Sequence, residues 1–517
     1  MFQGKIWQWR SLKRLVLVLI IICALMRFFN LGVKPYWYDE VYTSLRLSGY
    51  TKVDIFERVK TGQHTFGTLE NFQCPRGDRG IEDVFNGLIT DDVHPPLYFF
   101  LLYYWIKVFA CTVEQLRLFS ALLSLLLIPA SYALICEIFG SKTIALLSTL
   151  LVINSPIFII YAQEARQYIL LVVLALFSSI SLLRYFSNSS PKNLIMYGLL
   201  STAGLYCHTL YYGVMIGQVG YWLFCPNEFH QNRSLFKNII YKVRANRSFI
   251  FTLFLSFLLF LMWLFRVIYL KGFQISIGAD YTWKEFSSEI LFQRIILNLA
   301  SVINDFESPI KSQILTQNLV NLSLLDLNFK EIFTIIFIPL IILYSLWYTI
   351  KHSDRSRVSL LGWLALPSVL FLSKDLLFGG SSASIIRYQL LSVFGLYAAL
   401  SFCLVHLFKT TAFRWIKGII LVLVLILCQM QIYSNFNYLK SSTWWSKYGD
   451  YKLQEFAHQV NQSAHPIILG EANYREMVNL LKLSYILNPS VPFELVDKEN
   501  FSEISLNSYD VFWVPQV

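Results

Sequence analysis

The feature of this chain that most restricts its fold is a succession of long apolar runs separated by short clusters of basic residues. A helix that crosses a bilayer needs about 20 largely apolar residues, and about eleven runs approach that length. They cover residues 14–31, 117–138, 143–160, 167–186, 194–208, 210–225, 248–270, 331–350, 358–373, 388–408 and 418–434. The sequence therefore predicts an all-α polytopic membrane protein.

The composition supports a membrane protein over a soluble one. Of the 517 residues, 56% are hydrophobic and 15% are charged, whereas a soluble protein carries about 25% charged residues. A net charge of +11 would suggest a nucleic-acid partner in a soluble protein. Here the basic residues lie between apolar runs, which indicates membrane topology and contact with anionic lipid. We therefore expect no nucleic-acid partner.

The basic clusters also predict the orientation, because Lys and Arg concentrate in cytoplasmic loops. With the N-terminus inside, every second loop is basic, which places the N-terminus in the cytoplasm and the C-terminus outside. No small-residue cleavage site follows the first run, so it is expected to be a retained span. The run 194–225 is short for the two spans assigned to it, so whether it forms one span or two is left open.

Three long segments then lie outside, at residues 31–116, 271–330 and 435–517. Counting Pro95 to Ala110 as a span would turn every later basic loop outward, so we expect an interfacial helix in the first outer loop. Apolar clusters and an amphipathic pattern in the tail predict a small α/β domain. The expected domains are a transmembrane domain, 1–434, and a C-terminal extracytoplasmic domain, 435–517.

The cysteines give little framework. Of the eight, Cys74 and Cys111 are the pair that could meet outside the membrane. There is no CxxC motif, so the sequence indicates neither a disulfide framework nor a zinc knuckle.

Two adjacent acids, Asp39 and Glu40, follow the first span. Acids at the boundary between water and lipid are costly without partners. Adjacent carboxylates also repel, which favours a proton or a cation on one of them. The aromatic residues 36–38 before them fit an interfacial belt. We predict a functional site at the two acids.

A second candidate segment runs from Asp91 to Tyr98 and contains two acids, His94 and two prolines. Proline suits the first turn of a helix, so His94 is expected beside a helix N-terminus. Capping of that helix and a functional site remain two open interpretations.

A third candidate segment, residues 161–168, falls at the outer end of a span and contains Tyr161, Gln163, Glu164 and Arg166. Polar residues three and four apart share one side of a helix. They form either a surface ion pair or ligand groups that face the pocket of Asp39.

Arg117 and the pair Arg387 and Tyr388 begin later spans on the same face. An arginine at a helix end often only snorkels toward water. Three arginines on one face instead fit a phosphate site, because the planar guanidinium matches phosphate. They are Arg117, Arg166 and Arg387. His208 is a further candidate residue on the outer face.

The order of these motifs resembles the bacterial relatives of protein O-mannosyltransferases, which are glycosyltransferase family 39 and its neighbours with the GT-C membrane fold. The resemblance rests on Asp39-Glu40, then Asp92-Val93-His94-Pro95-Pro96-Leu97, Leu116-Arg117-Leu118-Phe119-Ser120-Ala121-Leu122 and Gln163-Glu164-Ala165-Arg166-Gln167-Tyr168. It is strongest over about the first 220 residues and extends more loosely to Arg387-Tyr388, Trp445 and Asp450.

The resemblance implies an inverting transfer of a sugar from a polyprenyl-phosphate donor, of undecaprenyl or dolichyl type, in the bacterial inner or plasma membrane. Asp39 matches the general base, and Glu40 is expected to act with it. The donor phosphate would be bound by Arg117, Arg166, Arg387 and Tyr388, and the substrates by His94, Tyr98, Tyr161, Gln163, Glu164 and His208. The acceptor would be a glycan, a lipid or a protein.

The expected reaction requires no cofactor. A divalent metal is possible, with His94 and Glu40 as the candidate ligands, but two ligands are too few to assign one.

Two other functions share this topology. A polymerase or ligase of lipid-linked oligosaccharides would use a pyrophosphate donor instead. A polytopic lipid transporter also needs many spans, but transporters often contain repeated halves, and no repeat is found in this sequence.

Overall fold

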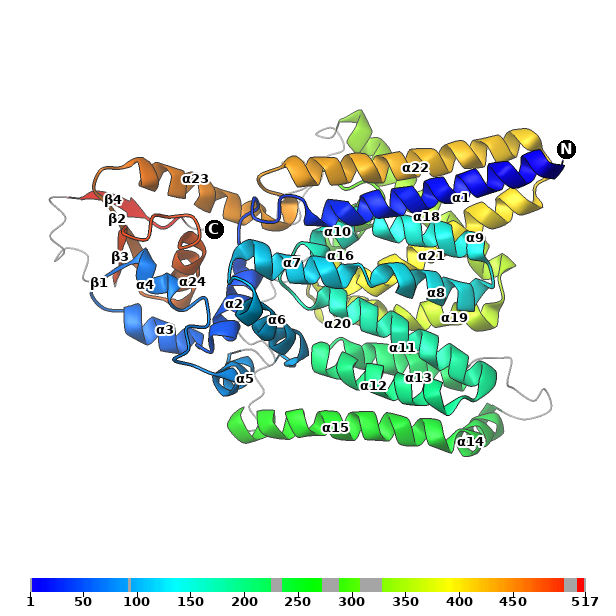
Figure 1. The fold of residues 1–517 in the computed structure, drawn as a ribbon, viewed down its shortest axis with the longest axis horizontal. Coiled ribbons are helices and arrows are strands. Elements are labelled where there is room, and N and C mark those ends of the chain that lie inside the picture. The colour runs from blue at the N-terminus through cyan, green and yellow to red at the C-terminus, as the bar shows by residue number, and fades with distance from the viewer. Residues whose placement is uncertain are drawn as a thin grey trace.

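The computed structural model describes residues 2–91, 94–224, 235–271, 288–306, 328–496 and 509–515. Most of the second outer segment, 271–330, lies outside the described residues, as does Asp92 of the second motif. The chain forms a bundle of long helices with a smaller α/β domain at one end (Figure 1). We call this smaller part the cap domain. It is built from residues 38–108 and 445–513.

Long helices and short connections form the bundle, as the apolar runs predict. Its elements are α1 (Phe2–Leu25), η1 (Met26–Phe28), α7 (Val113–Ser124), α8 (Leu127–Phe139), α9 (Lys142–Ile153), α10 (Pro156–Ala162), α11 (Tyr168–Asn188), α12 (Pro191–Cys207), α13 (Tyr211–Phe224), α14 (Leu235–Ala245), α15 (Arg247–Lys271), α16 (Ser288–Ser301), α18 (Phe329–His352), α19 (Arg355–Leu364), α20 (Leu366–Phe378), η4 (Ser382–Ser384), η5 (Ile386–Gln389), α21 (Leu390–Thr410) and α22 (Arg414–Lys440).

Each of the eleven expected spans coincides with a helix or a bent pair of helices in this bundle. Among the described residues, six helices are long and apolar enough to cross a membrane, or up to eight if each of two bent pairs is one span. The bent pairs are α9 with α10, at 57°, and α19 with α20, at 47°. The chain is thus a multi-pass membrane protein, and the number of eleven stays a prediction.

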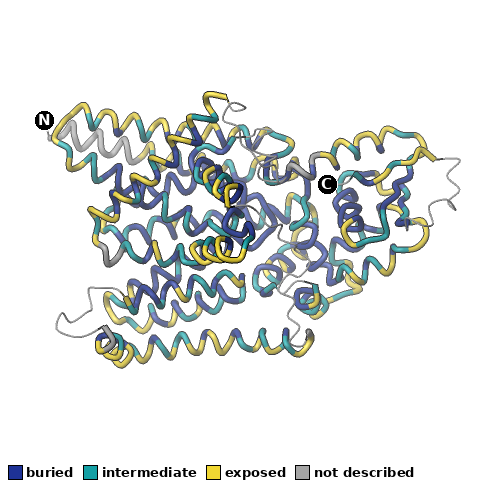
Figure 2. The backbone as a smooth tube through the Cα atoms, turned by 180° about the vertical axis from the view of Figure 1, so that it is seen from behind, coloured by how far each residue is buried: buried dark blue, intermediate teal, exposed yellow. Residues whose placement is uncertain are grey.

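The surface of the bundle is apolar, as contact with lipid requires. Large side chains on α15 and α22 are exposed, among them Phe254 and Met262 on one and Ile419 and Leu425 on the other. Figure 2 shows this exposure along the outermost helices, whereas the central helices are buried. Apolar surface of this extent does not face water in a monomeric soluble protein.

The interior of the bundle contains polar side chains that bond to one another. The hydroxyl of Tyr211 lies 2.7 Å from Oγ of Ser178, and the amide of Gln218 donates to Ser178 and Ser179 at 2.9 and 3.0 Å. Such bonds between helices stabilise helix packing in a membrane, where no water competes for them.

The cap domain contains α2 (Tyr38–Ser48), α3 (Lys52–Val59), α4 (Phe66–Glu70), α5 (Ile81–Thr90), α6 (Leu97–Val108), η6 (Trp445–Lys447), α23 (Tyr448–Gln462) and α24 (Tyr474–Leu483). The α6 helix agrees with the helix expected at Pro95 to Ala110. Its depth in the membrane stays a prediction.

A four-stranded sheet in the order β1-β3-β2-β4 joins the two parts of the cap domain. The strands β2 (Pro466–Glu471), β3 (Pro492–Val496) and β4 (Asp510–Trp513) are parallel neighbours in the tail. Strand β1 (Gln63–Thr65) comes from the first loop and pairs antiparallel with β3. The expected α/β tail is therefore present, but residues 435–517 are not a separate unit, because the first loop supplies an edge strand.

A disulfide between Cys74 and Cys111 closes the first loop on itself. These are the two cysteines that the sequence indicated could meet. The bond ties the segment before α5 to the segment after α6, and it holds the first loop beside the start of α7.

Candidate active site

The two adjacent acids lie in the first turn of α2, where the cap domain meets the bundle. Helix α2 begins after Trp37, whose backbone is extended, and ends at Gly49, which has a φ of 79°. Acids in the first turn of a helix are favoured by the helix dipole. Because Asp39 and Glu40 are successive residues of one helix, their side chains point in different directions.

Glu40 is fully buried and points into a cluster of cations. Its carboxylate accepts two bonds from Arg117, at 2.8 and 2.7 Å, and one from the Ala165 N–H at 3.0 Å. The ammonium of Lys447 lies 3.3 Å from Oε2. Burial alone would raise the pKa of Glu40, but Arg117, Lys447 and the Ala165 N–H lower this pKa to about 2. The carboxylate therefore stays charged in the fold.

Arg117 uses all five of its N–H donors inside the protein. Besides the two bonds to Glu40, it donates to the carbonyls of Leu31, Lys34 and Pro35 at 2.5, 3.1 and 2.8 Å. A guanidinium has five donors in all, so none remains for a donor phosphate. The structure places Arg117 and Glu40 in a buried support for the loop before α2, away from the phosphate and catalytic roles expected for them.

Asp39 is placed differently, between two arginines. Its Oδ2 lies 3.8 Å from Nε of Arg166 and 3.5 Å from Nη1 of Arg387. This oxygen has no hydrogen-bond partner among the residues that the structure describes. The side chain is 13% exposed. Asp39 can thus accept a bond from a bound molecule while two cations lie beside it.

The break between α10 and α11 supplies one of these arginines. Helix α10 ends at Ala162 and α11 begins at Tyr168, so the segment 163–167 lies outside both helices. Four bonds tie this turn to α2, and two of them come from Nη1 of Arg166, which donates to the Asp39 carbonyl at 3.2 Å and to the Thr43 hydroxyl at 3.3 Å. The Ala165 N–H donates to Glu40, and the Thr43 hydroxyl donates to the Ala165 carbonyl at 3.0 Å. Arg166 is therefore held at a fixed position relative to Asp39.

The other polar residues of this turn are buried. The Gln163 amide donates to the carbonyls of Arg27 and Phe29, at 3.1 and 2.8 Å, and so holds the end of the first span. Glu164 is 1% exposed, and within the described part of the chain neither of its oxygens has a hydrogen-bond partner. Burial, opposed by Lys447, raises the pKa of Glu164 to about 7.

Aromatic rings and two histidines surround the arginines. The ring of Tyr168 lies 5.9 and 5.8 Å from the guanidinium carbons of Arg166 and Arg387. The same ring lies 6.2 Å from Tyr388 and 5.5 Å from His208. Such faces attract guanidinium groups, and they hold both arginines around Asp39.

His94 and His208 face each other, with ring centroids 6.5 Å apart. Burial and Arg166 lower the pKa of His94 well below its usual range, so this ring is neutral at physiological pH. The Leu210 N–H donates to Nδ1 of His208 at 3.0 Å, so this nitrogen accepts a bond and does not carry the ring proton.

Two expected tyrosines lie at the margin of the site. The Tyr98 hydroxyl is buried and lies 2.7 Å from the Ser120 hydroxyl, so it joins α6 to α7. The ring of Tyr161 packs against Tyr168 at 6.0 Å. The structure thus brings together Asp39, Arg166, Arg387, Tyr388, His94 and His208, with Tyr161 and Glu164 behind them.

Several residues at the site were not among those expected. Tyr168 was quoted only within its motif, and Lys447, which reaches Glu40 from the tail, was not identified. Trp444 and Trp445 both donate to Asp305, at 2.6 and 2.9 Å, beside the same segment. Their one sequence signal was the Trp-containing segment at Trp445.

In the part of the chain that the structure describes, no group of three or more His, Cys, Asp or Glu side chains is arranged to hold a metal ion, and a metal at His94 and Glu40 stays a prediction. The Glu40 oxygens already accept bonds from Arg117, Lys447 and Ala165. A carboxylate with two cationic partners is a poor ligand for a third cation.

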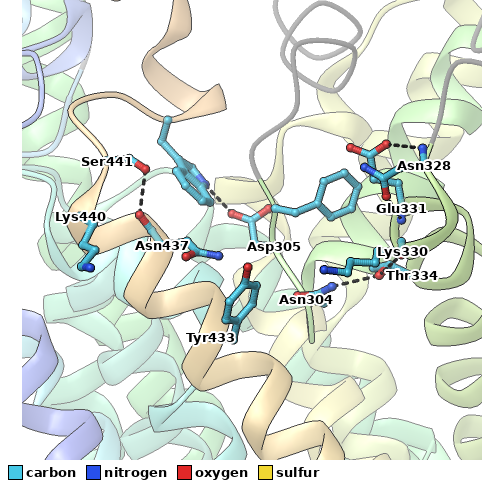
Figure 3. Close-up of a pocket in the computed structure, with 12 residues that line it drawn as sticks. Asn304, Asp305, Asn328, Lys330, Glu331, Thr334, Tyr433, Asn437, Lys440 and Ser441 are labelled. Atoms are coloured by element: carbon cyan, nitrogen blue, oxygen red, sulfur yellow. Dashed lines mark hydrogen bonds between the residues drawn. The ribbon is translucent and has the colours of Figure 1, made fainter.

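A pocket of about 430 Å³ lies between the ends of α18 and α22. Figure 3 shows Asp305 at its edge, accepting a hydrogen bond from an indole, with Tyr433, Asn437 and Lys440 on α22 across from it.

Comparison with known families bears on these motifs. Residues 93–263 match the family of dolichyl-phosphate-mannose-protein mannosyltransferases. The resemblance stated from the motifs is therefore confirmed over this segment, which contains His94, Arg117, Arg166 and His208. No curated protein matches the chain in sequence.

Solved structures that resemble this chain in their arrangement have low sequence identity to it. The Archaeoglobus fulgidus oligosaccharyltransferase in its apo form is 14% identical with a TM-score of 0.47, over 92% of this chain. This chain spans 64% of the length of that enzyme. ArnT from Cupriavidus metallidurans bound to undecaprenyl phosphate is 11% identical with a TM-score of 0.49, over 91% of this chain and 85% of ArnT.

Proposed function

We propose that the protein is an inverting GT-C glycosyltransferase that moves a sugar from a polyprenyl phosphate to an acceptor hydroxyl at the outer face of the membrane. The observation that carries this proposal is the position of Asp39, whose Oδ2 forms ion pairs with Arg166 and Arg387 and accepts no hydrogen bond from the described residues. The family match over residues 93–263 supports the same class of reaction.

In the proposed reaction, Asp39 acts as the general base. An acceptor hydroxyl attacks the anomeric carbon of the sugar, and its proton passes to Oδ2 of Asp39. The bond between the sugar and the phosphate breaks as the glycosidic bond forms, and the phosphate leaves with the electron pair. A positioned base of this kind contributes about 10²–10⁴ in rate.

Arg166 and Arg387 are proposed to bind the phosphate and to stabilise the charge that it gains as it leaves. Both guanidiniums lie within 3.8 Å of the Asp39 carboxylate, so the leaving group and the base would share one site. Fixed cations that face the developing charge are among the largest contributions to enzyme catalysis. Tyr388, His94 and His208 lie around the same site.

The other expected residues take supporting roles in this proposal. Arg117 and Glu40 hold the loop before α2, Gln163 holds the end of the first span, and Tyr98 joins α6 to α7. The reaction as proposed needs no cofactor, and a wash with EDTA is expected to leave transfer unchanged.

The outer location is supported by the bond between Cys74 and Cys111 in the cap domain. Disulfides form and persist in oxidising compartments such as the bacterial periplasm and the cell surface. An extracytoplasmic cap domain also agrees with the basic loops expected on the opposite side.

The test is transfer of labelled sugar by purified Asp39→Asn protein from a polyprenyl monophosphate donor. Glu57→Gln, which changes an exposed acid on α3, is the matched control. We expect Asp39→Asn to lose at least about 100-fold in kcat, the lower end of the contribution of a general base. Glu57→Gln should keep wild-type transfer. Equal transfer by both variants would remove Asp39 as the base.

A pyrophosphate donor distinguishes the polymerase or ligase. Wild-type protein is expected to transfer sugar from the monophosphate and not from the pyrophosphate. The reverse preference would favour the polymerase or ligase, and transport of lipid without any transfer would favour the transporter.

A further inference from the structure

Lys447 reaches the active site from the far end of the chain. It lies in η6, directly after α22, and its side chain is 1% exposed. Its Nζ lies 3.3 Å from Oε2 of Glu40 and 3.9 Å from Oε1 of Glu164. One ammonium thus lies between a carboxylate on α2 and a carboxylate on the turn 163–167.

The segment that bears Lys447 is itself held at a fixed place. Asp305, which follows α16, accepts bonds from the indole N–H groups of both Trp444 and Trp445. The Lys447 N–H donates to the Trp444 carbonyl at 2.7 Å. Trp444 is fully buried. These bonds clamp the tail segment against the bundle and direct the Lys447 side chain toward the two acids.

Lys447 is not needed to keep Glu40 paired, because Arg117 already binds both oxygens of Glu40. Glu164 is in a different position. Lys447 is the cation that lies within 4.0 Å of Glu164 among the residues that the structure describes, and no hydrogen bond satisfies its oxygens. Without Lys447, Glu164 would have no cation within 4.0 Å among the described residues. Glu40 would keep Arg117 as its cationic partner.

Glu40 and Glu164 are close in sequence to the two proposed active-site residues, Asp39 and Arg166. Glu40 follows Asp39 in α2, and Glu164 lies two residues before Arg166 in the turn. A cation that holds Glu40 and Glu164 together therefore acts with the bonds from Arg166 to the Asp39 carbonyl and the Thr43 hydroxyl to set the distance between Asp39 and Arg166. A displacement of about 1 Å in a reacting group can cost about 100-fold in rate.

We propose that Lys447 is a positioning residue, which sets the general base Asp39 against the phosphate-binding Arg166 by holding Glu40 and Glu164 together. The inference rests on the proposed function. It also makes the tail segment Trp444 to Lys447, with its clamp at Asp305, part of the active-site structure.

The kinetic test compares Lys447→Met with Lys482→Met in the purified full-length protein. Lys482 is a matched control, because it forms a buried ion pair with Asp450 in the cap domain, at 2.7 Å. We expect Lys447→Met to lower kcat at least tenfold per folded molecule with little change in the donor KM. Lys482→Met should keep kcat, although its melting temperature falls. Lys447→Arg, which keeps the charge, should retain more of kcat than Lys447→Met.

A cross-link gives a second readout that does not depend on activity. Thr43 on α2 contacts Ala165 in the turn 163–167. A protein with both Thr43→Cys and Ala165→Cys can therefore report the distance between α2 and this turn. In the double-cysteine protein, added oxidant should form the disulfide readily when Lys447 is present, and equally readily when Lys482→Met is added. Adding Lys447→Met should slow formation of the disulfide several-fold.

Unchanged kcat together with unchanged cross-linking in Lys447→Met would overturn the positioning role. A large rise in donor KM would also overturn it, since that result assigns Lys447 to substrate binding. Absence of transfer by the wild type would instead reject the proposed function, and the cross-link would still decide whether Lys447 sets the gap.

Discussion

Arg117 and Glu40 form a two-point ion pair, at 2.8 and 2.7 Å, in which neither side chain is more than 1% exposed. This pair joins α7 to α2 at the residue that follows the proposed base, Asp39. A buried ion pair adds little stability compared with a well-packed apolar pair, but removal of one partner leaves an uncompensated charge. The pair therefore matters most for the position of the loop before α2.

Arg117→Ala is expected to reduce stability by about 3–5 kcal/mol, because Glu40 stays buried and three backbone carbonyls lose their donor. Arg117→Lys should lose part of that amount, since an ammonium cannot reproduce the planar fork. Thermal unfolding in detergent measures both variants. Arg184→Ala is the control, because its pair with Glu137 is partly exposed and is worth at most about 1 kcal/mol. Equal losses in the three variants would contradict the assigned role.

Arg387→Lys is expected to weaken phosphate binding and to slow transfer. The lysine keeps the charge but loses the planar group that packs between Trp37, Tyr168 and Tyr388. We expect a loss of about 10²–10³ in kcat/KM for the donor, in the range found for other groups that stabilise a developing negative charge. Steady-state kinetics with varied donor measure the loss. An effect confined to the acceptor KM would place Arg387 outside the donor site.

Glu164 is expected to make stability depend on pH. Its pKa rises from the ordinary 4.5 to about 7 on folding, so the folded state holds more protons than the unfolded state between these values. Its contribution to stability is therefore lost as pH rises through this window. Glu164→Gln should remove that loss.

The measurement is the melting temperature of both proteins from pH 5 to pH 8. His94 acts in the opposite direction, because its pKa is lowered on folding. It is present in both proteins, so the difference between the two curves isolates Glu164. Parallel curves would mean that Glu164 keeps one protonation state throughout.

Cys74→Ser is expected to destabilise the cap domain by about 3–4 kcal/mol, since the disulfide closes a loop with a sequence separation of 37 residues. In intact cells, a membrane-impermeant thiol reagent should label Cys111 in this variant and leave the buried cysteines unlabelled. Labelling only after the membrane is opened would place the cap domain in the cytoplasm.

The sequence was informative wherever local chemistry decides the structure. Apolar length located the helices of the bundle, and the breaks at Pro95 and Pro156 follow from the geometry of proline. The turn 163–167 could be recognised as a polar interruption between two apolar runs. These features depend on neighbouring residues and need no knowledge of distant contacts.

The sequence was not informative where the function of a residue depends on a distant partner. Arg117 and Arg387 look alike in sequence, since each begins an apolar run, and only the fold shows that Glu40 and backbone carbonyls occupy one of them. Lys447 is one of many basic residues near helix ends, and its partners lie about 400 and about 280 positions away. Strand β1 is too short to be recognised without β3.

The edge strand β1 has a consequence for how the protein is made. A protein chain emerges from the ribosome in order, and domains generally fold as they appear. The partner of β1, strand β3, is synthesised only after all the helices of the bundle. The Leu481 carbonyl, which accepts a bond from the Gln73 amide, is likewise made 408 residues later. The cap domain can therefore be completed only after every helix of the bundle has been synthesised, and a chain truncated in its last spans would leave the first loop without its partners and open to proteolysis.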